Sequence, residues 1–284
     1  DENGRCFLVS ELLKGDSLYD QLKPKEPLSL ELALDVLYQV GSALEVAHNQ
    51  KTVHRDIKPP NIFLNKPMKG AGFVKLLDFG IAKVMGGEQK SLTVTGQIMG
   101  TPHYMSPEQI VNIKLVDHRS DIYSLGIVFY QMLTGAVPFD DESYFAIMKH
   151  QMQSPMPKLS LPQYSSQLVT DLQEILKLMT HKDVRKRVLN IKEINEKIEH
   201  IWQAYAVSSN AVTTGSFRSI SSDAIPIRAE QRTGKVSKEM DQMLEPFNGA
   251  DALIEGMFDS VAYGVERAVE IGSESPIPSD RPSN

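Results

Sequence analysis

The pattern of apolar and polar positions predicts a mainly helical chain. From residue 29, the segment SLELALDVLYQVGSALEVAH places apolar side chains three or four positions apart, which indicates a long amphipathic helix. Residues 121–134 are apolar on nearly every side and are followed by Gly135, which predicts a buried helix closed by this glycine. Further helices are expected at about 143–153, 165–180 and 190–205.

Short apolar runs predict strands in the first third of the chain. Residues 6–9 read as a buried strand, and residues 61–64 and 73–77 as two strands joined by a loop that contains glycine. The pair Gly15-Asp16 is typical of a turn. Ser17 is a candidate N-cap for a short helix through residue 22, which the following prolines would end.

Three segments either lack a sustained repeat of hydrophobic positions or differ in amino-acid composition from the rest of the chain. Residues 85–103 are rich in Gly, Ser, Thr and Lys and predict a long loop, and loops of this length are usually functional or disordered. Residues 206–235 are rich in Ser and Thr and predict a flexible linker. Residues 236–271 regain apolar periodicity and predict a helical segment of unknown role, and residues 272–284 a disordered tail.

Composition narrows the class of protein. The chain has 284 residues, of which 41% are hydrophobic, and 30 basic against 36 acidic residues give a net charge of −6. These values indicate a globular protein and argue against nucleic acid or an anionic membrane as its partner. A single cysteine, Cys6, and the lack of a long apolar run or signal peptide favour a cytoplasmic protein without a membrane segment. The chain opens without Met, directly before an apolar strand, and is expected to be an excerpt from a longer polypeptide.

The segment VHRDIKPPN (53–61) carries five polar or charged side chains within eight positions. Pro59 and Pro60 exclude a regular helix, and the apolar residues are too few for a buried strand. On its own, the segment could be a solvated basic loop.

Two further motifs follow at fixed separations. Asp78-Phe79-Gly80 comes seventeen residues after Asn61, at the end of the second predicted strand, and GTPHYMSPE occupies residues 100–108. Each motif alone is weak. In this order, on a loop, a strand end and a loop, they resemble the catalytic core of eukaryotic-type (Hanks-type) serine/threonine protein kinases, most closely the bacterial branch. The match continues through DHRSDIYSLG (117–126) to Arg187.

The resemblance implies an α+β, protein-kinase-like fold. Residues 1–205 would form the hinge strand, a small β-hairpin and the helical C-terminal lobe of a kinase domain. The family's glycine-rich loop, strand lysine and helix glutamate cannot be located in this chain. Lys14 and Lys23 both lie after the hinge and cannot replace that lysine, so the N-terminal lobe is expected to be absent from this chain.

The resemblance also implies the catalytic residues. Asp56 would accept and orient the substrate hydroxyl, and Lys58 would reach the transferring phosphate. Asn61 and Asp78 offer the hard oxygen ligands that suit Mg²⁺, with Mn²⁺ as an alternative ion. Thr101 would hydrogen-bond to Asp56 and Lys58. Taken singly, Asp56 and Asp78 could be capping residues and Asn61 a turn residue.

For ATP, the implied contacts lie at the hinge. The Glu11 carbonyl and the Leu13 backbone would meet the adenine, Ser10 would be a small gatekeeper, and Phe63 would form part of the floor under the base. A plain strand end and a core phenylalanine are the alternatives. Backbone contacts leave no trace in side chains, so the sequence does not separate these interpretations.

Other residues have implied structural roles. Asp121 would brace the backbone of the catalytic loop, and Glu108 and Arg187 would form a partly buried ion pair that ties the activation segment to the helical lobe. His54 and Phe79 are interpreted as packing residues, with no role for His54 as a base or metal ligand.

A regulatory switch is expected in the long loop. Arg55 directly precedes Asp56, and a phosphate on the loop would give this cation a partner, with help from Lys83. Thr93 and Thr95 lie where activating phosphorylation occurs in the kinases that this chain resembles. The alternative is that these threonines simply belong to a mobile loop.

The sequence is compatible with two functions. The first is ATP-dependent phosphorylation of serine and threonine hydroxyls on protein substrates, with a dimer of two kinase molecules for phosphorylation in trans. The second is a truncated or inactive kinase-like module that binds or scaffolds other proteins. Intact Asp56, Asn61 and Asp78 favour the first, because a scaffold has no chemical need for them. The excerpt alone is expected to be inactive.

Overall fold

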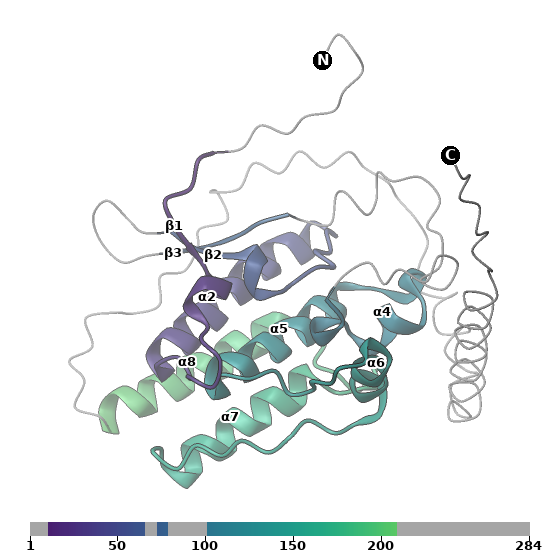
Figure 1. Ribbon diagram of the computed structural model, residues 1–284. Helices are drawn as coiled ribbons and strands as arrows, with labels where there is room; N and C mark the ends of the chain where they lie inside the picture. Colours follow the sequence, from purple (N-terminus) through teal and green to yellow (C-terminus); the bar gives the residue numbers. More distant parts are fainter. Residues whose placement is uncertain (1–10, 66–72, 79–100, 209–284) are drawn as a thin grey trace, which may run out of the picture. The chain divides into compact units, whose positions relative to one another are not determined.

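The structure is a computed structural model that describes residues 11–65, 73–78 and 101–208 (Figure 1). The linker predicted at 206–235 starts too early, because the chain is helical through Ser208. The rest of that linker, the segments that follow it and the predicted strand at 6–9 lie outside the described residues. So do five residues to which roles were assigned: Ser10, Phe79, Lys83, Thr93 and Thr95.

Within the described residues the predicted helices are confirmed, with bounds that differ from the expected ones by at most three residues. The helices are α1 (Leu18–Gln21), α2 (Leu30–Asn49), α4 (Pro107–Val111), α5 (His118–Thr134), α6 (Tyr144–Gln153), α7 (Ser166–Met179) and α8 (Ile191–Ser208). Short 3₁₀ turns cover Pro59–Asn61, Pro102–Tyr104 and Ile113–Leu115. The prediction missed α4, because five residues are too few to show a helical period.

Helix α5 lies at the centre of the helical part. It packs against both α2 and α7, and α8 packs against α2 and α7 (Figure 1). Twelve of its seventeen residues are buried, which explains why its sequence is apolar on nearly every side. Asp117 caps its start, and Gly135 ends it in the left-handed conformation, at φ 74°. This buried helix is the base on which the loops of the candidate site rest.

A three-stranded antiparallel sheet adjoins these helices. Strands β2 (Ile62–Asn65) and β3 (Phe73–Leu76) form the predicted hairpin, and β1 (Gly15–Ser17) pairs with β2 on its other side. The prediction of a turn at Gly15-Asp16 was therefore wrong. Gly15 is needed because its φ is 155° and a Cβ there would overlap the backbone carbonyl of Leu64.

The prediction for Ser17 is confirmed. Its hydroxyl accepts a hydrogen bond from the backbone N–H of Asp20, and the Asp20 carboxylate accepts one from the backbone N–H of Ser17, which is a capping box at the start of α1. The fold as a whole is α+β, as expected for a kinase-like C-terminal lobe.

Candidate active site

The buried carboxylate of Asp121, in the first turn of α5, holds the backbone of the catalytic loop. The backbone N–H groups of His54 and Arg55 donate to its two oxygens at 2.8 and 2.7 Å. His48, in the last turn of α2, adds a contact from Nε2 at 2.9 Å. Arg55 has a φ of 64°, a conformation that is strained for any residue with a side chain. The contacts with Asp121 stabilise this bend of the chain.

His54 connects the catalytic loop with the end of β3. Its Nε2 lies 2.8 Å from the carbonyl oxygen of Leu77, and its Nδ1 lies 3.3 Å from the backbone nitrogen of Asp56. A neutral ring that is protonated at Nε2 satisfies both contacts. Burial lowers the pKa of His54 below its ordinary value, although the charge of Asp121 opposes this shift. His54 is therefore a neutral residue that orients the loop.

The carboxylate of Asp56 lies at the centre of a small polar cluster. Lys58 Nζ is 2.9 Å from Asp56 Oδ2, and the amide nitrogen of Asn61 donates to the carbonyl oxygen of Asp56 at 2.8 Å and to Oδ2 at 3.1 Å. The side chains of Asp56 and Lys58 are each 23% exposed, so they are held in place and still reach solvent. The 3₁₀ turn Pro59–Asn61 brings Asn61 back toward Asp56.

Asp78 is placed beside this cluster by the backbone. The N–H of Leu77 donates to the carbonyl oxygen of Asn61 at 2.9 Å, and Asp78 follows directly, exposed and with a φ of 53°. Asn61 uses its amide nitrogen on Asp56, which leaves its amide oxygen available to a cation. Among the described residues, no group of three or more His, Cys, Asp or Glu side chains forms a ready-made metal cage.

The residues predicted to contact adenine lie at the start of the described chain. Glu11 is exposed and forms an ion pair with Lys75 of β3, and Leu13 is half-buried. Phe63 is half-buried on β2, between Ser17 of β1 and Lys75 of β3. The adenine contacts remain predictions.

Thr101 is exposed and directly precedes the 3₁₀ turn Pro102–Tyr104. Its hydrogen bonds to Asp56 and Lys58 also remain a prediction.

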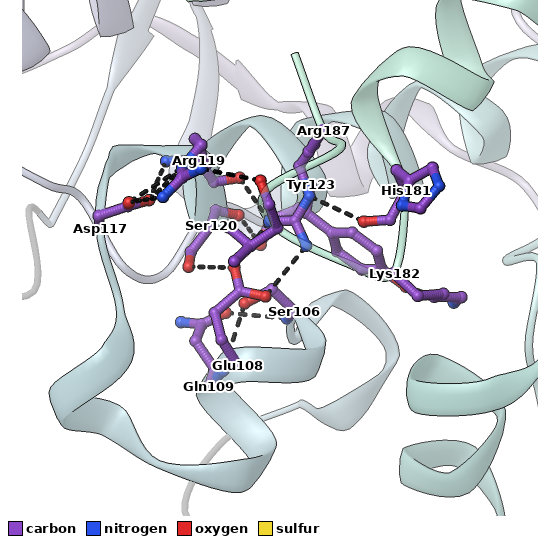
Figure 2. A network of polar contacts seen from close by, with 12 residues as sticks. Ser106, Glu108, Gln109, Asp117, Arg119, Ser120, Tyr123, His181, Lys182 and Arg187 are labelled. Atoms are coloured by element: carbon purple, nitrogen blue, oxygen red, sulfur yellow. Dashed lines mark hydrogen bonds and ion pairs between the residues drawn. The ribbon is translucent and has the colours of Figure 1, made fainter. Parts of the chain in front are cut away.

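Below the catalytic loop, Glu108 and Arg187 form a buried bidentate ion pair (Figure 2). The two N···O distances are 2.7 and 3.0 Å, and the side chains are 5% and 0% exposed. Ser120 donates a further hydrogen bond to Glu108, and Arg187 donates to the carbonyl oxygens of Arg119 and His181. Burial favours the neutral acid, but the hydrogen bonds and charge of Arg187 lower the pKa of Glu108 below its ordinary value.

Two residues near the site were missed by the sequence analysis. Gln109 closes a capping box with Ser106, and its amide also donates to the carbonyl oxygen of Arg55 at 3.0 Å. The S-x-x-Q spacing of this box was visible in the sequence. His48, by contrast, lies on a helix face whose contact with Asp121 depends on tertiary packing, and no local signal marks it.

Comparison with known proteins identifies the family of this chain. The family model "Protein kinase domain" matches residues 1–202, and the chain therefore belongs to the protein kinase family. Serine/threonine-protein kinase Pkn1 of Myxococcus xanthus is 44% identical over 55% of this chain and 22% of its own length. PknA of Corynebacterium glutamicum is 39% identical over 64% of this chain and 36% of its own length. PrkC of Bacillus subtilis is 31% identical over 84% of this chain and 35% of its own length.

The matched part of the chain thus spans between 22% and 36% of the length of these curated relatives. As regards membranes, none of the helices within residues 11–65, 73–78 and 101–208 combines the length and apolar character that a bilayer span requires.

Proposed function

We propose that the protein transfers the γ-phosphate of ATP to serine and threonine hydroxyls of protein substrates. The observation that carries this proposal is the Asp56–Lys58–Asn61 cluster, in which a carboxylate is fixed by two partners and remains partly exposed. The relatives named above, all from bacteria, are called serine/threonine kinases, which supports the same substrate class.

In this proposal, Asp56 accepts a hydrogen bond from the substrate hydroxyl and takes its proton as the oxygen attacks the γ-phosphorus. The bond to the β-phosphate oxygen breaks, and ADP leaves. Lys58, 2.9 Å from Asp56, lies close enough to neutralise the oxygens of the transferring group. Thr101 is proposed to hydrogen-bond to Asp56 and Lys58 and so to favour a short hydroxyl side chain.

The donor set at Asn61 and Asp78 fits Mg²⁺. Magnesium is usually bound by one or two protein oxygens together with phosphate oxygens, so two donors on adjoining segments suffice. When bound with ATP, the ion would neutralise the developing charge on the phosphates. Mn²⁺ prefers similar oxygen ligands and would fit as well. Glu11, Leu13 and Phe63 are proposed to hold the adenine.

The scaffold alternative is less well supported. A binding module would gain nothing from the strained backbone at Arg55 and Asp78 or from a carboxylate held ready by Lys58 and Asn61. Strain of this kind is typical of active sites.

A kinase assay with Asp56→Asn tests the proposal. In the full-length protein we expect activity to fall by about 10³-fold, because the general base is lost, with little change in thermal stability. Asp171→Asn, which replaces a partly exposed carboxylate of α7 that pairs with Gln167, is the matched control and should keep full activity. Phosphoamino-acid analysis should find phosphoserine and phosphothreonine. Predominant phosphotyrosine, or equal activity of Asp56→Asn and the wild type, would refute the assignment.

We also propose that phosphorylation of Thr93 or Thr95, in trans between two kinase molecules, raises activity. Support comes from Arg55, whose buried Nε has no hydrogen-bond partner among the described residues. A buried N–H donor without an acceptor is costly, and a phosphate would supply the missing acceptor through charge-assisted bonds, with Lys83 as a second cation.

Replacing both threonines by alanine in the full-length protein should lower activity about tenfold or more. Mass spectrometry of the wild type should find phosphate on at least one of them. Thr170→Ala, which removes an exposed hydroxyl from α7, is the control and should leave activity unchanged. Full activity of the double variant would show that these hydroxyls do not control the enzyme.

A further inference from the structure

A chain of hydrogen bonds crosses the helical lobe beneath the candidate site. Lys182 Nζ donates to the hydroxyl oxygen of Tyr123 at 2.7 Å, and this hydroxyl donates to Gln151 Oε1 at 2.6 Å. The amide nitrogen of Gln151 in turn donates to the backbone carbonyl oxygens of His103 and Pro102. These carbonyls directly follow Thr101. The relay thus joins the loop after α7, α5 and α6 to the segment Thr101–Glu108.

The middle of this relay is buried. Tyr123 and Gln151 are both fully inaccessible to solvent, so water cannot replace a hydrogen bond that is lost there. The amine of Lys182 lies 4.4 Å from the ring centre of Phe139 and 5.2 Å from that of Tyr123. It is therefore held in one place by aromatic rings as well as by its hydrogen bonds.

The direction of the relay depends on the charge of Lys182. An ammonium group has only donors, so the Tyr123 hydroxyl must accept from it and can direct its own proton only toward Gln151. A neutral amine has a lone pair and can accept the Tyr123 proton instead. In that arrangement, Gln151 loses its donor, and its hold on the two backbone carbonyls weakens.

We propose that Lys182 is a positioning residue of the active site: its ammonium group fixes the segment Thr101–Glu108 for the protein substrate, and loss of its charge loosens that segment. This inference rests on the proposed kinase function. It assigns to a lysine outside the catalytic cluster a role in the binding of the protein substrate.

The surroundings of Lys182 allow its charge to change near neutral pH. Burial and the nearby charge of Arg187 lower the pKa of Lys182 to about 7. Arg187 is itself paired with Glu108, and burial raises the pKa of Tyr123, so that phenol stays neutral. His150, whose ring stacks on Phe139, and His181, beside Arg187, also lie here. Variants of Lys182 are therefore needed to assign the titration.

The main test measures KM and kcat of the full-length protein for a peptide that does not titrate between about pH 6 and pH 8.5. For the wild type we expect KM to rise about threefold to tenfold over this range, the effect of one weakened hydrogen bond, with a smaller change in kcat. Lys182→Met should show, at every pH, the high KM that the wild type has at about pH 8.5. Lys182→Arg keeps its charge and should show the low KM of the wild type at about pH 6 throughout the range. Lys186→Met, an exposed lysine of the same loop, should behave like the wild type.

A second measurement separates this inference from the kinase assignment. The side-chain amide resonance of Gln151, observed by NMR in the full-length protein, should shift with the protonation of Lys182 in the wild type and stay constant in Tyr123→Phe, which keeps the ring. A constant resonance in the wild type, an unchanged KM profile in Lys182→Met, or a wild-type profile in Lys182→Arg would overturn the relay. A wild type without kinase activity at any pH would refute the proposed function, and the Gln151 titration would still decide the relay.

Discussion

The two ion pairs of the site differ in how they use the same chemistry. Asp56–Lys58 and Glu108–Arg187 have similar N···O distances, 2.9 and 2.7 Å, but the first pair is 23% exposed on each side and the second is almost fully buried. Every oxygen of the buried Glu108 carboxylate has a partner, whereas the Asp56 carboxylate remains accessible to a ligand. An ion pair that is buried and has all its hydrogen bonds made serves the structure, whereas a partly exposed pair remains available for chemistry.

The backbone conformation around the two ion pairs differs in the same way. Four described residues other than glycine have positive φ, and two of them, Arg55 and Asp78, belong to the catalytic loop and the strand end beside it. The segment around Glu108 is regular, with a capping box and a short helix. Strain of about 1 kcal/mol or more per residue is therefore placed where the proposed chemistry occurs.

The largest effect on stability is expected from breaking the buried pair. Glu108→Gln leaves the guanidinium of Arg187 in the interior without a counter-charge, which should lower the free energy of unfolding by about 3–5 kcal/mol. The matched control is Arg185→Ala, which removes a half-exposed arginine from a surface pair with Asp183 and should cost at most about 1 kcal/mol. Denaturant titration measures both. Equal losses in the two variants would contradict the distinction between buried and exposed pairs.

A smaller effect is expected at Asp121, which links the catalytic loop to helix α5. Asp121→Asn replaces one acceptor oxygen by a donor that faces the N–H groups of His54 or Arg55. We expect a loss of about 1–3 kcal/mol of stability together with lower kinase activity, because the bend at Arg55 loses its support. Chemical denaturation and a kinase assay on the same preparation measure the two effects. Asp171→Asn serves again as the control, and a variant as stable as this control would show that Asp121 does not brace the loop.

Much of this fold followed from the sequence, because long helices carry a strong period. Helix α2 and the buried helix α5 were predicted with nearly their observed bounds. The strand at Gly15–Ser17 was missed because Gly and Asp favour turns locally, and only pairing with β2 makes this segment extended. The identity of Asp56, Asn61 and Asp78 as candidates came from motif spacing. The Lys182 relay could not be predicted, since its members lie on three separate elements.

The smallest expected effect is the dependence of folding stability on pH. Because burial lowers the pKa of His54, the unfolded chain binds the proton more readily, and stability should be full above about pH 6.5 and decrease as the pH falls below that value. For one proton, the slope is at most about 1.4 kcal/mol per pH unit. Thermal unfolding at several pH values should show that His54→Gln reduces this slope. His200→Gln, an exposed histidine on α8, should leave it unchanged, and equal slopes for all three proteins would contradict a neutral buried His54.

The distance along the chain between Glu108 and Arg187 has a consequence for the order of folding. Arg187 follows Glu108 by 79 positions, and α5, α6 and α7 lie between them. During synthesis, the segment Thr101–Glu108 leaves the ribosome well before Arg187 exists, so its anchor cannot form until the last part of the lobe has been made. Helix α2, whose contacts within the helix are local, has no such delay. The segment proposed to receive the protein substrate therefore lacks its anchor until the chain has been made through Arg187, which follows α7 and precedes α8.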